Sequence, residues 1–271
     1  MSSLILVEPI GGLANRIRAI HSAAALASHY NVPLQINWTR DPSCNCSFND
    51  LFEVCEGVLV NEINRFNFFY RFYHRILPMK TMLAGGCYLE QKDVEKMMGD
   101  NVDFRQLNFR NYLYISTCSS FFTANHSLQL VPVKNLQQQI QALYSTFGRY
   151  VVGVHIRRTD NRYSIQGSPT SAFISRMQIE QQINPDAVFF LATDDPEEEQ
   201  ILKLHFPGKI ITYRKKCLCR REPTAICDAL IDLYCLSKTK KIIGSYWSSF
   251  SEQAALLGGC ELIIAQDSVK I

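Results

Sequence analysis

The chain has 271 residues, of which 47% are hydrophobic and 20% charged, and its formal net charge is +3. This composition is typical of a globular protein with one large domain or two of ordinary size. So small a net charge gives no reason to expect a nucleic-acid partner. The sequence begins without the basic and apolar segments of a signal peptide, and it has no run of about 18 apolar residues. We therefore expect a cytoplasmic protein that spans no membrane.

The first predicted elements are a strand, a glycine turn and a helix. Residues 4–10 are apolar enough for a strand, and Gly11 and Gly12 follow it. Apolar residues then recur at helical spacing, at Leu13, Ile17, Ile20, Ala24 and Ala27. A helix that starts after a glycine turn can bind an anion with its free amides. Gly12 would let a ligand approach the backbone, and Asn15 or Arg16 could reach it; the alternative is a tight turn with a surface Asn and Arg.

Residues 33–38 and 112–116 predict two further strands in the first half of the chain. Residues 66–77 combine aromatic and basic side chains, and two interpretations of them stay open. They form a surface for peripheral membrane contact or for stacking on a sugar acceptor. Alternatively, they form a core helix flanked by arginines whose stems cover apolar surface.

The ten cysteines predict no metal site. Two groups have the closest spacing, Cys44, Cys46 and Cys55 in the first half and Cys217, Cys219 and Cys227 in the second. Neither group has the paired spacing of a zinc module. We expect reduced thiols, several of them packed as small apolar side chains.

The second half alternates strands and helices in a regular way. A helix over residues 132–147 is expected to connect the two halves. The predicted strands are 150–156, 187–192, 209–213, 240–245 and 261–265, and the predicted helices are 171–183, 196–205, 223–237 and 249–257. This alternation predicts an α/β fold with a parallel, doubly wound sheet. We expect two Rossmann-like domains, 1–131 and 132–271.

Polar residues gather where the strand 150–156 ends, and they are His155, Arg157, Arg158 and Asp160. Ligands of open α/β sheets bind beyond the carboxyl ends of the strands. Two guanidiniums there match the oxygens of a diphosphate. The alternative is a solvated Arg-Arg pair at a strand end.

Two aspartates follow the strand 187–192. Asp195 precedes Pro196, which predicts a helix N-cap with proline at the first helical position. Asp194 is then left to line the site or to hold an arginine. Asp232 lies in the predicted helix 223–237 among apolar neighbours, where a carboxylate needs a partner, unless it lies on the solvent face of the helix.

Serines open the last predicted helix. Ser249 and Glu252 have the spacing of a capping box. The same helix start, with Ser248 and Ser251, could hold a phosphate with hydroxyls and amides.

The block from His155 to Asp160, His-Ile-Arg-Arg-Thr-Asp, resembles the signature of the α1,6-fucosyltransferases and the rhizobial nodulation fucosyltransferases. More loosely, it is similar to the α1,2- and protein O-fucosyltransferases. Two further blocks of the resemblance, residues 190–196 and 231–251, follow in the expected order, and residues 11–16 look like the glycine loop of these enzymes. Residues 40–130 match none of the family's blocks.

The resemblance implies a GT-B-like fold in which two Rossmann-like domains face a cleft, the first on the acceptor side and the second binding a GDP-sugar. It implies an inverting, metal-independent transfer of fucose from GDP-fucose to a glycan, with no cofactor. The implied catalytic residues are Arg158, Arg157 and Asp160. The implied donor-binding residues are His155, Arg157, Arg158, Asp194, Asp232, Ser248, Ser249, Phe250, Ser251, Gly12, Asn15 and Arg16, among which His155 and Asp232 would read the guanine.

The sequence departs from the family at the base that would activate the acceptor. The α1,6-fucosyltransferases have an acidic residue shortly after this block, whereas residues 161–166 contain no carboxylate. The base is therefore Asp160, Glu8 or no protein group. Two other functions stay open: transfer from a different nucleotide-sugar, and a catalytically silent protein that binds nucleotide or glycan.

Overall fold

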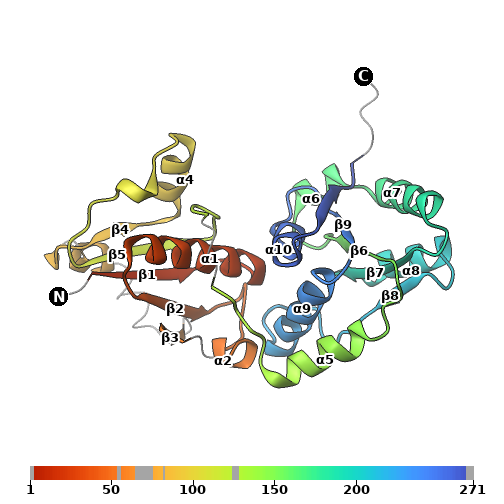
Figure 1. Ribbon diagram of the computed structural model, residues 1–271, viewed down its shortest axis with the longest axis horizontal. Coiled ribbons are helices and arrows are strands. Elements are labelled where there is room, and N and C mark those ends of the chain that lie inside the picture. The colour runs from red at the N-terminus through yellow and green to blue at the C-terminus, as the bar shows by residue number, and fades with distance from the viewer. Residues whose placement is uncertain (1–2, 54–55, 65–75, 82, 124–127, 267–271) are drawn as a thin grey trace. The chain divides into compact units, whose positions relative to one another are not determined.

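The computed structural model describes residues 3–53, 56–64, 76–81, 83–123 and 128–266. Within these ranges the chain has an α/β fold with two parallel sheets of five strands each. The sheets belong to two compact units, drawn in Figure 1: Met1–Val133 with Cys219–Cys227, and Lys134–Leu218 with Asp228–Ile271. The predicted fold class is confirmed. Compactness does not show which segments fold independently, so the domain boundary after residue 131 and the cleft stay predictions.

The sheet of the first unit has the strand order β3-β2-β1-β5-β4. Its strands are β1 (Leu4–Pro9), β2 (Leu34–Arg40), β3 (Val58–Asn64), β4 (Cys87–Leu89) and β5 (Tyr112–Thr117). Its helical segments are α1 (Leu13–Tyr30), α2 (Phe48–Leu51), α4 (Gln91–Gly99) and the 3-10 turn η1 (Phe104–Gln106). The predicted strands β1, β2 and β5 and the helix after Gly12 are confirmed.

Five elements of this unit were not predicted, namely β3, β4, α2, α4 and η1. Strand β3 pairs with β2 along its full length, but polar residues interrupt it and Leu59 points to solvent. Strand β4 has only three residues, too few for a periodic signal. Residues 76–81 are helical, whereas residues 65–75 lie outside the described part of the chain, so both interpretations of residues 66–77 stay predictions.

The sheet of the second unit has the strand order β10-β9-β6-β7-β8. Its strands are β6 (Val151–Ile156), β7 (Val188–Thr193), β8 (Ile210–Thr212), β9 (Lys241–Gly244) and β10 (Glu261–Ile264). Its helices are α5 (Lys134–Tyr144), α6 (Arg162–Gly167), α7 (Thr170–Ile183), α8 (Pro196–His205), α9 (Pro223–Leu236) and α10 (Ser249–Gly258). Apart from α6, which was not predicted, every one of these elements begins and ends within three residues of its predicted range.

Side chains of β6 alternate between the two faces of its sheet, as in any strand. Val152, Val154 and Ile156 join a buried apolar cluster with residues of α7 and α8. On the other face, a Cβ added to Gly153 would lie 2.9 Å from the side chain of Leu236, the last residue of α9. Helices therefore cover both faces, as Figure 1 also shows, and the predicted doubly wound arrangement is confirmed.

The strand order places a topological switch point beside β6. The chain passes from β6 to β7 on one side and later returns to β9 on the other. Loops that follow strands on opposite sides of such a point diverge and leave a crevice, in which open α/β sheets bind their ligands. The fold therefore indicates a ligand site at the residues that follow β6 and β9.

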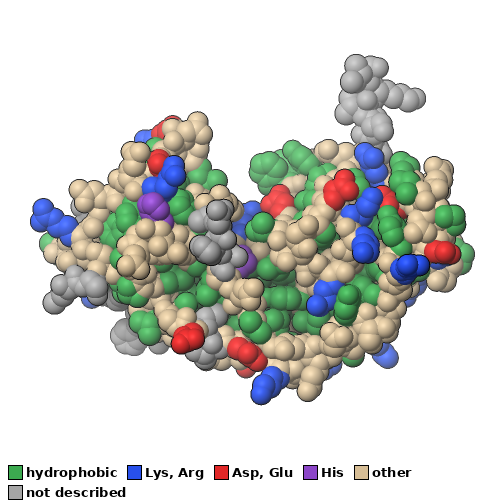
Figure 2. All heavy atoms as spheres, viewed as in Figure 1, with side chains coloured by type: hydrophobic (Ala, Val, Ile, Leu, Met, Phe, Trp, Pro, Cys, Tyr) green, Lys and Arg blue, Asp and Glu red, His purple; other side chains and the backbone are tan. Residues whose placement is uncertain are grey.

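The described helices include none long and apolar enough to cross a membrane. Figure 2 shows acidic and basic side chains interspersed on the visible face of each unit.

Candidate functional site

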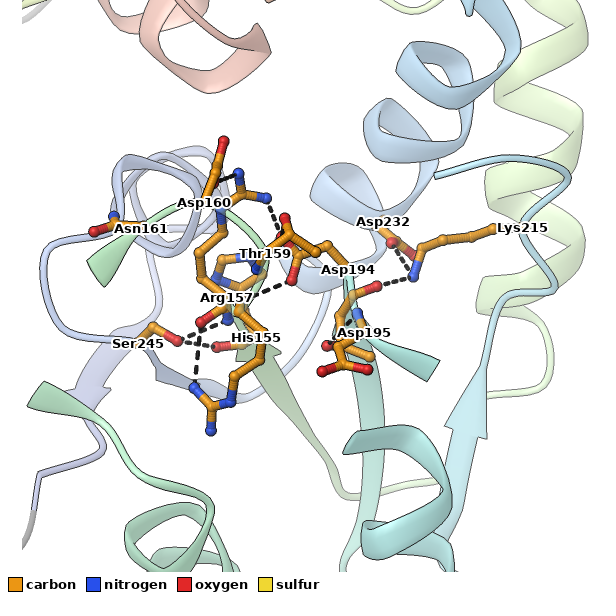
Figure 3. A network of polar contacts seen from close by, with 12 residues as sticks. His155, Arg157, Thr159, Asp160, Asn161, Asp194, Asp195, Lys215, Asp232 and Ser245 are labelled. Carbon is orange, nitrogen blue, oxygen red and sulfur yellow. Dashed lines mark hydrogen bonds and ion pairs between the residues drawn. The ribbon is translucent and has the colours of Figure 1, made fainter. Parts of the chain in front are cut away.

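The site in the second unit is built on the end of β6. His155 lies on the same face of the strand as Gly153, and Arg157 follows in the same alternation. The amide of Arg157 donates to Ser245 Oγ at 2.9 Å, which connects the end of β6 to the end of β9. Ser245 Oγ also donates to the main-chain oxygen of His155 at 3.3 Å. These bonds, drawn in Figure 3, hold the two strand ends of the switch point together.

Arg157 is held between two carboxylates. Its guanidinium forms ion pairs with Asp194, which follows β7, and with Asp160. The side chain of Asp160 is 57% exposed, whereas those of Arg157 and Asp194 are mostly covered. Arg157 thus lies next to the exposed Asp160, as Figure 3 shows, and an anion that replaced Asp160 would contact its guanidinium.

Asp194 organises the segment between Arg157 and Thr159. One carboxylate oxygen accepts from the Arg158 amide at 2.8 Å, and the other from Thr159 Oγ1 at 2.7 Å. Burial raises the pKa of Asp194, but Arg157, the Thr159 hydroxyl and the Arg158 amide outweigh burial and lower it below its usual value. Asp194 is therefore ionised at neutral pH and positions Arg157. The N-cap predicted at Asp195 is confirmed, because its side chain accepts from the Glu197 amide at 2.9 Å.

Arg158 points to the opposite face of the sheet. Its guanidinium forms an ion pair with Glu198 of α8, donates to Thr170 Oγ1 and lies 5.7 Å from the centre of the Phe173 ring. The side chains of Arg158 and Glu198 are 10% and 7% exposed. From the sequence we predicted that Arg157 and Arg158 together bind one diphosphate. The structure corrects this picture, because strand alternation sends the second guanidinium into a buried ion pair against α7 and α8.

His155 is buried against α10. Its Nδ1 lies 2.7 Å from Ser251 Oγ, and its ring stacks on Phe250 with the centroids 4.7 Å apart. Burial, chiefly, lowers the pKa of His155 to about 3, with Asp194 acting in the opposite direction. The imidazole is therefore neutral at physiological pH and offers one N–H donor and one acceptor.

Asp232 is a buried carboxylate with one open oxygen. Its Oδ2 lies 3.0 Å from Lys215 Nζ, which also donates to the main-chain oxygen of Thr193 at the end of β7. Its Oδ1 is buried and has no hydrogen-bond partner within the described ranges. Burial raises the pKa of Asp232 to about 6, although Lys215 acts in the opposite direction. Figure 3 shows this pair beside Asp194 and His155.

The N-cap of helix α10 lies one residue before the predicted cap, Ser249. Ser248 is the N-cap and makes no side-chain capping bond. The predicted capping box of Ser249 and Glu252 is therefore wrong, because Ser249 already lies in the first turn of the helix. The amides of this turn are those that a helix start offers to an anion. Ser251 is used differently from the prediction, since it is fully buried and bonded to His155.

Gly244, the last residue of β9, leaves the space that Ser251 occupies. A Cβ at position 244 would lie 2.5 Å from Ser251 Cβ and 2.9 Å from a methyl group of Leu262. We expect Gly244→Ala to displace Ser251 and to destabilise the protein by about 1–3 kcal/mol, as overpacking of a core does. Thermal unfolding measures the loss, and NMR of the His155 ring measures its displacement. An unchanged His155 signal in a normally stable variant would contradict this packing.

In the first unit the predicted donor-binding residues lie at the start of α1. Gly11 has a φ of +80°, which favours glycine, and a Cβ on Gly12 would lie 3.7 Å from Arg220 Nη1. Asn15 Oδ1 is buried without a hydrogen-bond partner in the part of the chain that the structure describes. Asn15 thus has a polar atom without a described partner at the helix start, and Gly12 has no side chain to cover the backbone. Contacts of these two residues with a sugar nucleotide stay predictions.

Arg16 is fully buried in the same unit. It forms an ion pair with Asp41 at 2.9 Å, donates to the main-chain oxygens of Gly11 and Thr39, and lies 4.8 Å from the centre of the Trp38 ring. These contacts use its guanidinium inside the core. The expectation that Arg16 reaches into a ligand site is corrected to a structural position.

Glu8 is also fully buried. Its carboxylate accepts from Thr39 Oγ1 at 3.2 Å and from the Tyr114 hydroxyl at 2.9 Å. Both carboxylate oxygens therefore have partners, and no exposed face of Glu8 is left for an acceptor. This placement disfavours Glu8 as the acceptor base.

The cysteines give no cluster of metal ligands among the described residues. Cys46 Sγ and Cys227 Sγ lie 4.0 Å apart, which is not a disulfide distance. Burial raises the pKa of Cys44 to about 11, so this thiol is protonated. Cys55 lies outside the described part.

The structure thus brings His155, Arg157, Asp160 and Asp194 together with Ser251 and Phe250, and it places Asp232 beside them. Sequence reasoning missed two residues of this site, Ser245 and Lys215. Ser245 closes a predicted strand, so its position at the edge of the sheet was a usable signal. Lys215 follows β8 in an irregular segment, and nothing in the local pattern indicates its partner.

No model of a known protein family matches the chain, and no curated protein matches it by sequence. Solved structures do match. A NodZ α-1,6-fucosyltransferase crystal soaked with GDP-fucose is 18% identical to this chain, the match covers 95% of this chain and 93% of that chain, and the TM-score is 0.66. The Bradyrhizobium NodZ structure is 17% identical, the match covers 99% of this chain and 96% of that chain, and the TM-score is 0.65. Arabidopsis thaliana FUT1 with the substitution R284K, in complex with GDP, is 14% identical, with 97% and 70% covered and a TM-score of 0.63. An apo-form of POFUT1 is 11% identical, with 97% and 98% covered and a TM-score of 0.55.

At these identities the likeness shows the fold. The α/β fold of the chain is similar to that of the GT-B fucosyltransferases, as its sequence led us to expect, whereas the domain boundary and the cleft stay predictions.

Proposed function

We propose that this chain is an inverting glycosyltransferase that transfers fucose from GDP-fucose to a hydroxyl group of a glycan. The observation that carries the proposal is the buried carboxylate of Asp232, whose Oδ1 has no partner among the described residues while Lys215 holds Oδ2. A buried acceptor left open costs free energy unless a ligand supplies donors. The N1–H and N2–H groups of a guanine supply two donors on one edge. The similar NodZ crystal was soaked with GDP-fucose and the similar FUT1 is in complex with GDP, which supports this choice of nucleotide.

Arg157 is the residue that we propose to hold the diphosphate. Its amide is bonded to Ser245, three residues before the N-cap of α10, so its fixed positive charge and the free amides of that helix start would face the same anion. When the bond between the sugar C1 and the phosphate oxygen breaks, its electron pair stays on GDP. A preorganised cation stabilises that charge as it develops. With a guanidinium in this role, we propose that transfer needs no metal ion.

The acceptor hydroxyl would attack C1 from the face opposite to GDP, which inverts the configuration. Its proton must pass to a base, and we propose Asp160, which is exposed and adjacent to Arg157. A diphosphate that takes over Arg157 would release Asp160 from its ion pair. The carboxylate would then be available to accept the proton.

One observation favours a second candidate function. Residues 161–166 carry no carboxylate, whereas the resembled enzymes have an acidic residue there. A protein that binds GDP without transferring a sugar would fit this departure. A donor other than GDP-fucose is a further alternative, because no residue of the site is assigned to the sugar's methyl group.

Calorimetric titration of the full chain with GDP, ADP and UDP tests the proposal. We expect GDP to bind at least about tenfold more tightly than ADP or UDP, because only guanine presents the paired donors. EDTA should leave the affinity unchanged. A panel of GDP-sugars, followed by release of GDP, then separates an enzyme from a silent binding protein. Equal affinity for ADP would overturn the proposed base recognition, and loss of binding in EDTA would overturn metal independence.

A further inference from the structure

Three aromatic side chains of the second unit form an exposed cluster beside the proposed donor site. Tyr163 and Trp247 are 67% and 66% exposed, and Tyr246 is 37% exposed. The ring centroids of Tyr163 and Trp247 lie 6.0 Å apart, as do those of Tyr246 and Trp247. Tyr163 belongs to α6, which follows β6, and the other two residues connect β9 to α10. We call these three residues the aromatic platform.

Hydrogen bonds connect the two segments that carry the platform. Asn161 Nδ2 donates to the main-chain oxygen of Trp247 at 2.9 Å, and Ser164 Oγ donates to that of Tyr246 at 2.7 Å. The Tyr246 amide donates to Ser168 Oγ at 2.8 Å. Because the side chains of one loop bind the backbone of the other, the rings are presented by two connected segments and not by a free loop.

The backbone of the platform is unusual at Trp247. This residue has a φ of +54°, in the left-handed region that bulky residues rarely adopt. Such conformations persist where the surroundings impose them, and they cluster at functional sites. Gly167 is a second constraint, because a Cβ there would lie 2.6 Å from the Tyr246 ring. The fold thus imposes a rare backbone conformation on Trp247 and requires glycine at position 167, while the Trp247 indole stays exposed to solvent.

We propose that the aromatic platform binds a sugar ring of the glycan acceptor, by stacking of the ring's C–H face on Trp247, with the tilted Tyr163 ring against its edge. This inference rests on the proposed function, which supplies a glycan as the second substrate. Flat, stiff aromatic faces lose little entropy on binding, and they suit a ring that is apolar on its face and polar at its rim. The tyrosine hydroxyls supply polar groups around them.

The position of the platform supports an acceptor site in particular. Asn161 directly follows Asp160, and Ser248, the N-cap of α10, directly follows Trp247. Figure 3 shows Asn161 to one side of Arg157 and Asp160. A ring on the platform would therefore lie next to the residue proposed as base. Three side chains are too few for a stable protein interface, which takes about 20–30 residues a side.

The chain contains a built-in probe for this inference. It has two tryptophans, Trp247 in the platform and Trp38, which is fully buried. A sugar that stacks on Trp247 should shift its fluorescence and shield it from iodide, whereas Trp38 is already shielded. Trp247→Phe identifies the source of the signal without removing an aromatic ring.

The experiment titrates the full chain with tetrasaccharides of glucose, N-acetylglucosamine, mannose and galactose, with and without GDP. We expect at least one of them to protect Trp247 from iodide. Calorimetry should show binding of that tetrasaccharide weakened by about tenfold in Trp247→Ala and in Tyr163→Ala, with GDP affinity within about twofold of wild type. Leu204→Ala, which removes an exposed apolar residue from α8, is the matched control and should change neither. Alanine keeps the backbone cost at position 247, so the substitution isolates the ring.

The outcomes separate this inference from the proposed function. GDP binding without protection by any tetrasaccharide overturns the platform and leaves the proposed donor site standing. Protection by a tetrasaccharide in a chain that does not bind GDP supports the platform and defeats the proposed donor. A blue shift with phosphatidylcholine vesicles and none with sugars would show a membrane contact and would also overturn the inference.

Discussion

Replacing Arg157 with alanine is expected to lower the release of GDP from GDP-fucose by about a hundredfold or more, because the leaving diphosphate loses the cation that stabilises its charge. The fold should tolerate the change. Asp160 is exposed, and Asp194 keeps its bonds to Thr159 and to the Arg158 amide. The rate under saturating donor and the melting temperature together measure the effect.

Arg158→Ala provides the contrast. It would leave Glu198 buried without its ion-pair partner, and Glu198 Oε2 already has no hydrogen-bond partner in the described structure. Breaking such a pair typically costs about 3–5 kcal/mol of stability. The double variant Arg158→Met with Glu198→Gln should recover part of that loss. If Arg158→Ala melted normally and stopped GDP release as completely as Arg157→Ala, the separation of the two roles would be wrong.

The second large effect concerns Asp232 and the pH dependence of GDP binding. If only the carboxylate accepts from guanine, affinity should be constant above pH 6 and fall about tenfold for each pH unit below it, since burial raises the pKa of Asp232 to about 6. Asp232→Asn should weaken GDP binding by about tenfold to a hundredfold and remove this pH dependence. Titrations at several pH values between 4.5 and 8 measure both.

Lys215→Met tests the same site from its other side. Lys215 lowers the pKa of Asp232 through its charge and hydrogen bond, whereas burial and the nearby Asp228 and Glu199 raise it. Without Lys215 the pKa should rise further, so the loss of affinity should begin at a higher pH. Lys215→Arg should restore the wild-type profile. A profile of Lys215→Met identical to that of wild type would show that another group controls GDP binding.

The pH also acts on stability through Asp232, in the opposite direction to affinity. A carboxyl whose pKa is higher in the folded than in the unfolded protein binds its proton more tightly when folded. Its contribution is present below pH 4 and is lost as the pH rises towards 6. Melting temperatures at each pH are therefore the control that separates weaker binding from partial unfolding.

The elements of the second half were predictable because its strands are short, apolar and separated by well-marked helix starts such as Asp195-Pro196. In the first half, β3 and β4 escaped prediction. Val58–Asn64 has neither a continuous apolar run nor a clean alternation, and its place at the edge of the sheet is set by pairing with β2. Strand order was also beyond the sequence, because it depends on contacts between distant segments.

The site was predictable in its position and less so in its details. His155 and Arg157 were placed correctly at the end of a strand. The divergence of Arg157 and Arg158 follows from strand alternation and could have been predicted by extending the period of β6 by two residues. The partner of Asp232 could not, because Lys215 reaches it from an irregular segment after β8. Burial of Arg16 likewise depends on Asp41 and Trp38, which are far from it in sequence.

The two carboxylates around Arg157 imply that ligands arrive by exchange. A small anion such as inorganic phosphate would have to displace Asp160 without forming any further contact, so it should compete poorly even at high phosphate concentration. A nucleotide that is also anchored through its base can meet that cost, and when it departs Asp160 closes over the guanidinium again. The ion pair between Arg157 and Asp160 would then both select against small anions and speed the release of GDP.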